Sequence, residues 1–143
     1  MSSLGGGAVA IDSVIVIYFI EEHPKFLPII LPLFRDADQS KRQLVTSSIT
    51  LLEVLVVPCR AGDRALADRY EALLTRSRGV QVVDVTREQL RAAAQLRAAT
   101  GVRTPDALQL VAALGAGCTA FVTNDRRLPA IPGLRIVQLD ASR

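Results

Sequence analysis

Short apolar runs alternate with longer segments of helical character along the whole sequence, and this alternation leaves few possible folds. Five runs are rich in Val, Ile and Leu and are short enough to be single strands: 8–11, 43–48, 80–85, 118–123 and 134–139. Near-continuous apolar strands are typical of parallel sheets that helices cover on both faces. We therefore predict an α/β domain of the three-layer α/β/α type, with a parallel five-stranded sheet.

The segments between these runs carry helix signals. The expected helices are 13–22, 23–37, 49–62, 64–78, 86–101 and 105–117. Residues suited to N-caps lie at or just before the start of four of them, namely Ser48, Asp63, Thr86 and Thr104. In open α/β sheets, ligands bind outside the carboxyl ends of the strands, where the following helices begin. We therefore expect functional residues at the carboxyl edge of the sheet.

The composition fits one domain with an aliphatic core. Of 143 residues, 50% are hydrophobic and only 4% are aromatic. We expect a flexible tail at residues 1–7 and a single domain at 8–143. The apolar run at 14–20 is far shorter than a bilayer span, and the N-terminus lacks the basic start and long apolar stretch of a signal peptide. Neither a membrane segment nor secretion is expected.

The cysteines and the single histidine argue against a zinc site. Cys59 and Cys118 have no CxxC spacing, and His23 is the only histidine. Zinc sites in proteins need more thiolate or imidazole ligands than these residues supply. A reducing cytoplasm is the simplest setting for such a chain.

Four acidic residues map to the carboxyl edge of the predicted sheet. Asp12 directly follows the first strand, and Asp125 lies just after the fourth. Glu53 lies near the start of the helix after the second strand, and Asp106 near the start of the helix before the fourth. Each pair of like charges about 4 Å apart would cost about 4 kcal/mol at an effective dielectric of 20. A bound divalent cation would relieve this repulsion.

Oxygen ligands without imidazole or thiolate favour Mg²⁺ or Mn²⁺ over zinc. Such an ion activates water and stabilises charge on a phosphoryl oxygen, so hydrolysis of a phosphodiester is the natural chemistry. Each acid also has a purely structural interpretation. Asp12 is suited to cap a helix, Asp106 to interact with a helix dipole, and Asp125 to form a turn. Glu53 is harder to explain in this way, because it is the only charge in "LLEVLVV" and a buried unpaired carboxylate is unfavourable.

The sequence resembles PIN-domain ribonucleases, especially the VapC-like toxins of type II toxin–antitoxin modules, over about 9–139. The segments that carry the resemblance are "AIDSVIVIYFIE", "TSSITLLEVLVVPCRAGD", "TPDALQLVAAL" and "FVTNDRRL". The resemblance implies an Mg²⁺- or Mn²⁺-dependent endoribonuclease that forms a homodimer and is inhibited by a partner antitoxin. It also implies a role for each matching residue: Asp12, Glu53, Asp106 and Asp125 as metal-binding acids, with Ser13 and either Thr123 or Asn124 as polar neighbours.

One position departs from the family pattern. Family members commonly carry an aromatic residue three positions after the last acid, where this chain has Leu128. We expect that corner to pack differently, with no effect on the acids.

Arginines make up most of the basic residues, and arginine matches phosphate oxygens better than lysine does. Arg103, Arg126 and Arg127 are nearest in sequence to the acidic edge and are expected to contact RNA. The alternative for these three side chains is ordinary solvated surface charge.

Other classes of α/β protein fit the sequence poorly. A phosphoacceptor receiver domain needs adjacent acids after its first strand, whereas Ser13 follows Asp12. A dinucleotide-binding domain needs glycines after that strand, whereas the run at 5–7 precedes it. The alternative that stays open is a non-catalytic PIN scaffold that binds RNA or a protein without cutting. The sequence does not specify which RNA would be the target.

Overall fold

The computed structural model describes residues 4–139, and a sheet of five parallel strands forms its centre. The strands are β1 (Val9–Ile11), β2 (Leu44–Ser47), β3 (Val80–Val83), β4 (Ala120–Thr123) and β5 (Arg135–Gln138). Their order in the sheet is β3-β2-β1-β4-β5, and every pairing is parallel. The prediction of a parallel five-stranded sheet is confirmed, and β1 lies in the middle of it.

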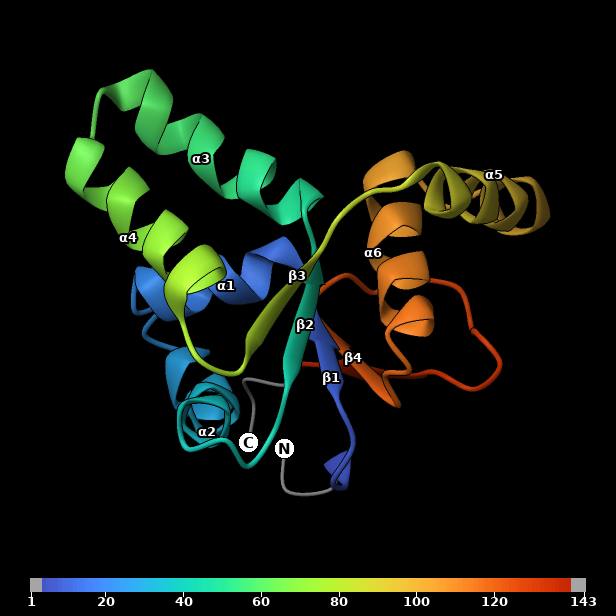
Figure 1. Cartoon of the computed structure of the whole chain (residues 1–143), viewed down its shortest axis with the longest axis horizontal. Coiled ribbons are helices and arrows are strands. Elements are labelled where there is room, and N and C mark those ends of the chain that lie inside the picture. Colours follow the sequence, from blue (N-terminus) through green and yellow to red (C-terminus); the bar gives the residue numbers. More distant parts are fainter. Residues whose placement is uncertain (1–3, 140–143) are drawn as a thin grey trace.

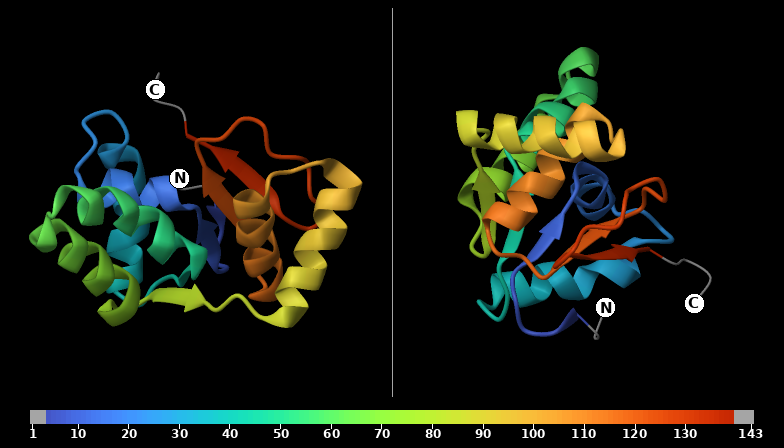
Figure 2. Two further views of the ribbon diagram at one scale, coloured as in Figure 1. Left: turned by 90° about the horizontal axis from the view of Figure 1, so that it is seen from above. Right: turned by 90° about the vertical axis from the view of Figure 1, so that its right-hand side faces the viewer.

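Six helices among the described residues cover the two faces of the sheet. They are α1 (Ser13–Ile20), α2 (Leu27–Asp38), α3 (Ile49–Ala61), α4 (Arg64–Arg76), α5 (Arg87–Thr100) and α6 (Thr104–Gly115). Helices α1 to α4 lie on one side of the sheet and α5 and α6 on the other (Figures 1 and 2). This is the predicted three-layer α/β/α arrangement.

The hydrophobic core has two halves, one on each face of the sheet. Along β1 the side chains alternate, with Val9 and Ile11 in one cluster and Ala10 in the other. The first cluster includes buried residues of α1, α2 and α4, and the second is built mainly from α6. All three β1 residues are fully buried. The central strand is thus apolar along its whole length, as a doubly covered parallel sheet requires.

The boundary between the first two helices differs from the prediction. Helix α1 ends at Ile20, and α2 does not begin until Leu27. Between them, Glu22 has a positive φ of 53°, and the Nδ1 atom of His23 accepts a hydrogen bond from the Phe26 N–H at 3.3 Å. The histidine ring therefore stabilises a turn at residues 23–26, which the sequence predicts as the start of the second helix.

Two of the four expected N-caps are confirmed. The side chains of Asp63 and Thr86 accept hydrogen bonds from the backbone of α4 and α5. Ser48 precedes α3 but makes no capping bond, because its hydroxyl accepts from the Val85 N–H at 3.2 Å. Thr104 is wrong by one position, since it is already helical and Arg103 is the N-cap residue of α6.

Part of the segment predicted as a tail packs against the domain. Leu4 is buried, and Arg42 donates hydrogen bonds to the carbonyls of Gly7 at 3.0 Å and Gly5 at 2.6 Å. Residues 1–3 of that predicted tail lie outside the described residues. The packed part of the chain therefore starts earlier than Ala8. Within residues 4–139, no helix combines the length and the apolar character that a membrane span needs.

Candidate functional site

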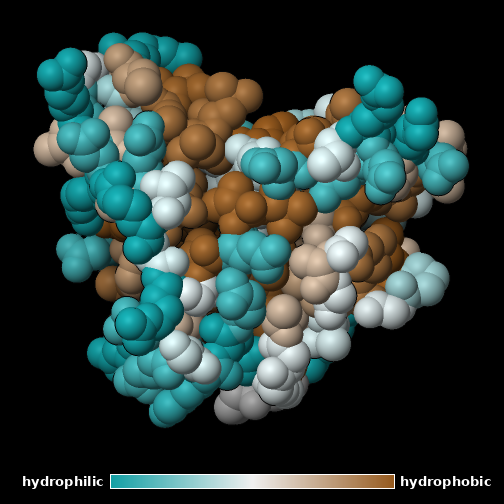
Figure 3. Space-filling model, in the orientation of Figure 1, coloured by the Kyte–Doolittle hydropathy of each residue, from teal (hydrophilic) through white to brown (hydrophobic). Residues whose placement is uncertain are grey.

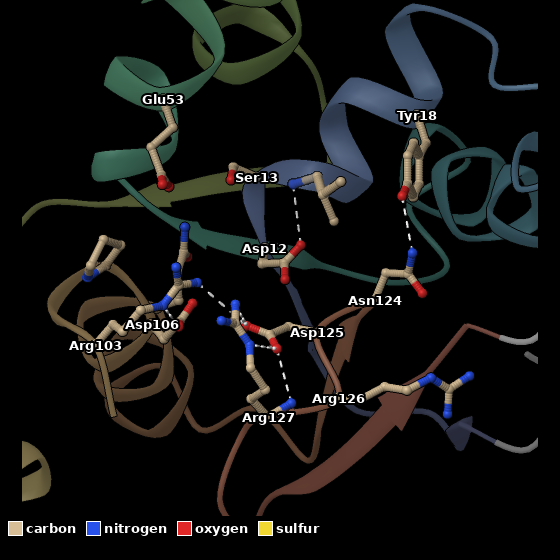
Figure 4. A pocket seen from close by; sticks show the side chains of 13 residues that line it. Asp12, Ser13, Tyr18, Glu53, Arg103, Asp106, Asn124, Asp125, Arg126 and Arg127 are labelled. Carbon is tan, nitrogen blue, oxygen red and sulfur yellow. Dashed lines mark hydrogen bonds and ion pairs between the residues drawn. The ribbon is translucent and has the colours of Figure 1, made fainter. Parts of the chain in front are cut away.

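A cavity of about 600 Å³ opens at the carboxyl edge of the sheet (Figure 4). All four predicted acids line it, together with five of the six predicted supporting residues: Asp12, Glu53, Asp106, Asp125, Ser13, Arg103, Asn124, Arg126 and Arg127. The sixth, Thr123, lies just beneath and contacts Asp12. The structure thus brings together residues that are far apart in the sequence.

The topology explains this convergence. Asp12 directly follows β1, and Asp125 lies two residues beyond the end of the neighbouring strand β4. Asp106 lies in the first turn of α6, and Glu53 on the second turn of α3, the helix that follows β2. Because all these strands are parallel, their carboxyl ends meet at one edge of the sheet.

Asp12 is held by hydrogen bonds from two directions. Its Oδ1 accepts from the Val14 N–H at 3.2 Å, and its Oδ2 accepts from the Thr123 hydroxyl at 2.5 Å. Burial raises the pKa of Asp12 to about 6, although these hydrogen bonds favour the charged form and oppose the rise. The carboxyl group is therefore both the N-cap of α1 and a desolvated acid at the cavity wall.

Glu53 lies across the cavity from the other three acids, on the same side as the Ser13 hydroxyl (Figure 4). Burial raises the pKa of Glu53, and the negative charge of Asp106 acts in the same direction. The Ser13 hydroxyl lowers it in part. A raised pKa means that the folded protein holds this charge at a cost, as expected of a group poised for a cation.

Asp106 and Asp125 are paired with arginines. Arg103 Nε lies 3.1 Å from Asp106 Oδ2, and Arg103 Nη2 lies 3.5 Å from Asp125 Oδ2. Arg127 Nε lies 3.0 Å from Asp125 Oδ1. The Arg127 guanidinium is the main reason that the pKa of Asp125 is lowered. Arg126, by contrast, points away from the acids (Figure 4).

The donor set fits a hard divalent cation by its chemistry, since it consists of four carboxylates and a neighbouring hydroxyl, with no imidazole or thiolate. As the side chains stand, no three acidic, histidine or cysteine residues in 4–139 are grouped closely enough to hold one ion. Arg103 and Arg127 lie against two of the acids, and Glu53 lies across the cavity (Figure 4). A cation at the acids would require the arginines to move.

Gln109 is a residue of the site that the sequence did not indicate, although it lines the cavity and is almost fully buried. Its Oε1 accepts from the Ser47 N–H at 3.1 Å, and its Nε2 donates to the Thr50 hydroxyl at 2.7 Å. These bonds join α6, β2 and α3, the elements that position Asp106 and Glu53. One feature of the sequence points to a buried polar contact at this position, because Gln109 is the only polar residue in "ALQLVAAL".

Tyr18 was also missed. It lines the cavity, stacks on Phe26 with ring centroids 4.8 Å apart, and its hydroxyl accepts from Asn124 Nδ2 at 3.0 Å. This bond fixes the loop that carries Asp125 against α1. Its hydroxyl is the only polar side-chain group in "VIVIYFI", but the sequence does not show that this hydroxyl faces the cavity.

Comparison with known proteins agrees with this architecture. Chains with similar folds come from VapBC2 of Rickettsia felis bound to a promoter DNA fragment (TM-score 0.70, 17% identity, 93% of this chain and 99% of that one). A second similar chain comes from a toxin–antitoxin complex of Klebsiella pneumoniae (TM-score 0.67, 17% identity, 89% of this chain and 95% of that one). A third comes from DNA-bound VapBC of Salmonella typhimurium (TM-score 0.61, 24% identity, 92% of this chain and 98% of that one). At these identities the likeness shows the fold alone.

No curated protein sequence matches the chain significantly. The sequence model of the PIN domain matches residues 9–134, a range that contains all five strands except the last and all four acids of the cavity. A match over most of the chain, together with the fold, identifies the family. The chain belongs to the PIN domain family.

Proposed function

We propose that this protein is a Mg²⁺- or Mn²⁺-dependent endoribonuclease and the toxin of a toxin–antitoxin pair. The observation that carries the proposal is the convergence of Asp12, Glu53, Asp106 and Asp125 on one cavity of a PIN fold. The structural neighbours are VapBC and toxin–antitoxin complexes, which supports the same class of activity.

The four acids would hold the metal, which when bound activates water and stabilises negative charge on the phosphate. The chain's own residues supply the rest of the site. Thr123 fixes the orientation of the Asp12 carboxylate, and Asn124 ties the Asp125 loop to Tyr18. Exposed arginines at the rim of the cavity are suited to bind the RNA backbone on either side of the cut.

The test is cleavage of a few structured RNAs by purified protein in Mg²⁺, in Mn²⁺ and after exhaustive EDTA treatment. We expect cleavage in both metals, none in EDTA, and none with an Asp12→Asn variant under any condition. Undiminished cleavage in EDTA would refute the metal requirement. Ca²⁺ should bind yet support little turnover, because its looser coordination positions water and phosphate poorly.

The arginine pairing of Asp106 and Asp125 favours one alternative, a PIN scaffold that binds RNA without cutting it. In that case the acids would serve as ion-pair partners and have no catalytic role. RNA binding that is independent of metal, with no cleavage of any substrate, would support the alternative.

We further propose an antitoxin as partner, because the similar structures are toxin–antitoxin complexes. An arginine of such a partner that reached the acids would inhibit the site economically by substituting for the metal's charge. Expression without the partner should be toxic to the native host. Harmless expression of protein that is active in vitro would count against the toxin assignment.

A homodimer is also part of the proposal. Helix α3 exposes three large apolar side chains, Leu52 (65%), Val56 (40%) and Val57 (65%), and Figure 3 shows apolar surface gathered over this helix. Exposed apolar patches of this kind mark interaction surfaces. Light scattering should give twice the monomer mass, and Val57→Asp should reduce it to the monomer value. The free cysteines Cys59 and Cys118 are compatible with the cytoplasm as the proposed location.

A further inference from the structure

Two arginines hold two of the acids that the proposed nuclease would use for its metal. The Arg103 guanidinium contacts carboxylate oxygens of both Asp106 and Asp125, which come from different segments of the chain. Arg127 binds both oxygens of Asp125, with Nε 3.0 Å from Oδ1 and Nη2 3.3 Å from Oδ2. While these contacts hold, two positive guanidiniums lie against the same oxygens and oppose the approach of a second cation.

The arginines are far more exposed than the acids. Their side chains are 61% and 71% exposed, against 19% for Asp106 and 17% for Asp125. Exposed ion pairs contribute little to stability, so both guanidiniums can leave at small cost. The acids, in contrast, remain at the cavity wall and need another cation when the arginines leave. A divalent ion supplies that charge.

We propose that Arg103 and Arg127 form a latch that metal displaces. Without metal they neutralise Asp106 and Asp125, and when a divalent ion binds these acids both guanidiniums are released to bind phosphates of the RNA. This inference rests on the proposed function, because it takes the acids to be metal ligands. It makes metal and phosphate binding cooperative, and each ligand then raises the affinity for the other by the same factor.

Arg126 is a matched control for this idea. It is the sequence neighbour of Arg127, carries the same charge and lines the same cavity. Its side chain points away from the acids in Figure 4, and it forms no ion pair within residues 4–139. Removing it changes the net charge near the site without opening the latch.

The first measurement is Mn²⁺ binding by calorimetry to the wild type and to Arg103→Gln, Arg127→Gln and Arg126→Gln. We expect the Arg103 and Arg127 variants to bind Mn²⁺ about three- to tenfold more tightly than the Arg126 variant, because each loses contacts that compete with the ion. An equal gain in all three variants would show a general charge effect and would overturn the latch.

The second measurement is the affinity for a single-stranded DNA oligonucleotide as a function of KCl, by fluorescence anisotropy, with the oligonucleotide's integrity checked on a gel. For single strands each phosphate contact contributes about 0.7 to the slope of log affinity against log salt. We expect Arg103→Gln to make this slope shallower by about 0.7 in Mn²⁺ and to leave it unchanged in EDTA. Equal lowering in both conditions would mean that Arg103 binds phosphate without being released by metal.

Neither measurement uses cleavage, so the latch and the nuclease are tested separately. Tighter Mn²⁺ binding by both latch variants in a protein that never cuts RNA would support the latch and refute the nuclease. RNA cleavage together with identical Mn²⁺ affinity in every variant would refute the latch alone. If the wild type binds no Mn²⁺ at all, both are overturned.

Discussion

Replacing Asp12 by Asn should stabilise the metal-free protein near neutral pH, although it removes an acid of the proposed site. Burial raises the pKa of Asp12 from 3.8 to about 6. At 1.36 kcal/mol per pKa unit, holding this charge in the folded protein costs about 3 kcal/mol at pH 7.5. An Asn side chain has nearly the same shape and carries no charge.

The gain is reduced by the hydrogen bonds of Asp12. Asn can still accept from the Val14 N–H through its Oδ1, but its Nδ2 is a donor and cannot accept the proton of the Thr123 hydroxyl, so that bond is lost. One such bond contributes about 1 kcal/mol. The net expectation is a variant that is about 2 kcal/mol more stable at pH 7.5.

The difference should depend on pH with a definite sign. A group whose pKa is raised on folding contributes stability below its unfolded pKa and loses it as pH rises through the folded pKa. The wild type should therefore lose stability relative to the Asn variant between about pH 4 and pH 6. At pH 4, just above the unfolded pKa of 3.8, the charge costs only about 0.5 kcal/mol, so the lost hydrogen bond should leave the variant about 0.5 kcal/mol less stable than the wild type.

Urea unfolding in EDTA at pH 4, 5, 6 and 7.5 measures this crossover. Asp84→Asn is the control, since Asp84 is exposed and lies outside the cavity, and it should change stability by less than about 0.5 kcal/mol at every pH. Addition of Mg²⁺ should stabilise the wild type and leave Asp12→Asn unchanged. A variant that is less stable than the wild type at pH 7.5 would refute the reasoning.

Three further predictions concern other parts of the structure. Gln109→Leu should lower the free energy of unfolding by about 2 to 4 kcal/mol, because it leaves the buried Ser47 N–H without its partner and removes one of the two hydrogen bonds of the Thr50 hydroxyl. Urea unfolding measures this loss. Gly79→Ala should lower the free energy of unfolding by at least about 2 kcal/mol more than Gly117→Ala does, again measured by urea unfolding. Both glycines have a positive φ, but a Cβ at 79 would collide with the backbone of α2, whereas a Cβ at 117 would meet open space. Asp106→Asn should abolish metal-supported RNA cleavage while changing the free energy of unfolding by less than about 1 kcal/mol, since it breaks only a partly exposed ion pair. An active Asp106→Asn enzyme would exclude this residue from the metal site.

The sequence predicted which strands and helices form better than it predicted where each one begins and ends. The apolar runs located all five strands because a central parallel strand must be buried on both faces, and β1 shows this pattern directly. Each predicted strand was longer than the observed one, since side-chain type does not show where backbone pairing stops. Ser48 failed as a cap because its hydroxyl bonds to Val85, a long-range contact that no local pattern reveals.

The candidate site was predictable for a similar reason. Strand polarity places the residue after each strand at one edge, so the position of Asp12 and Asp125 followed from the strand assignments. The ion pairs of Arg103 with Asp106 and Asp125 did not follow, because they depend on the direction that the side chain takes from the N-cap position of α6. The strand order β3-β2-β1-β4-β5 was likewise not evident, since it depends on where each helical crossover returns.

The central position of β1 also sets when the site can exist during synthesis. Its partner β4 lies near the other end of the chain, and β4 delivers both Thr123 and Asp125 to the cavity that contains Asp12. A ribosome releases the N-terminal part first. One edge of β1 therefore stays unpaired, and the acidic pocket incomplete, until the C-terminal strands have joined the sheet. In the proposed nuclease, the catalytic pocket therefore cannot form before β4 has left the ribosome.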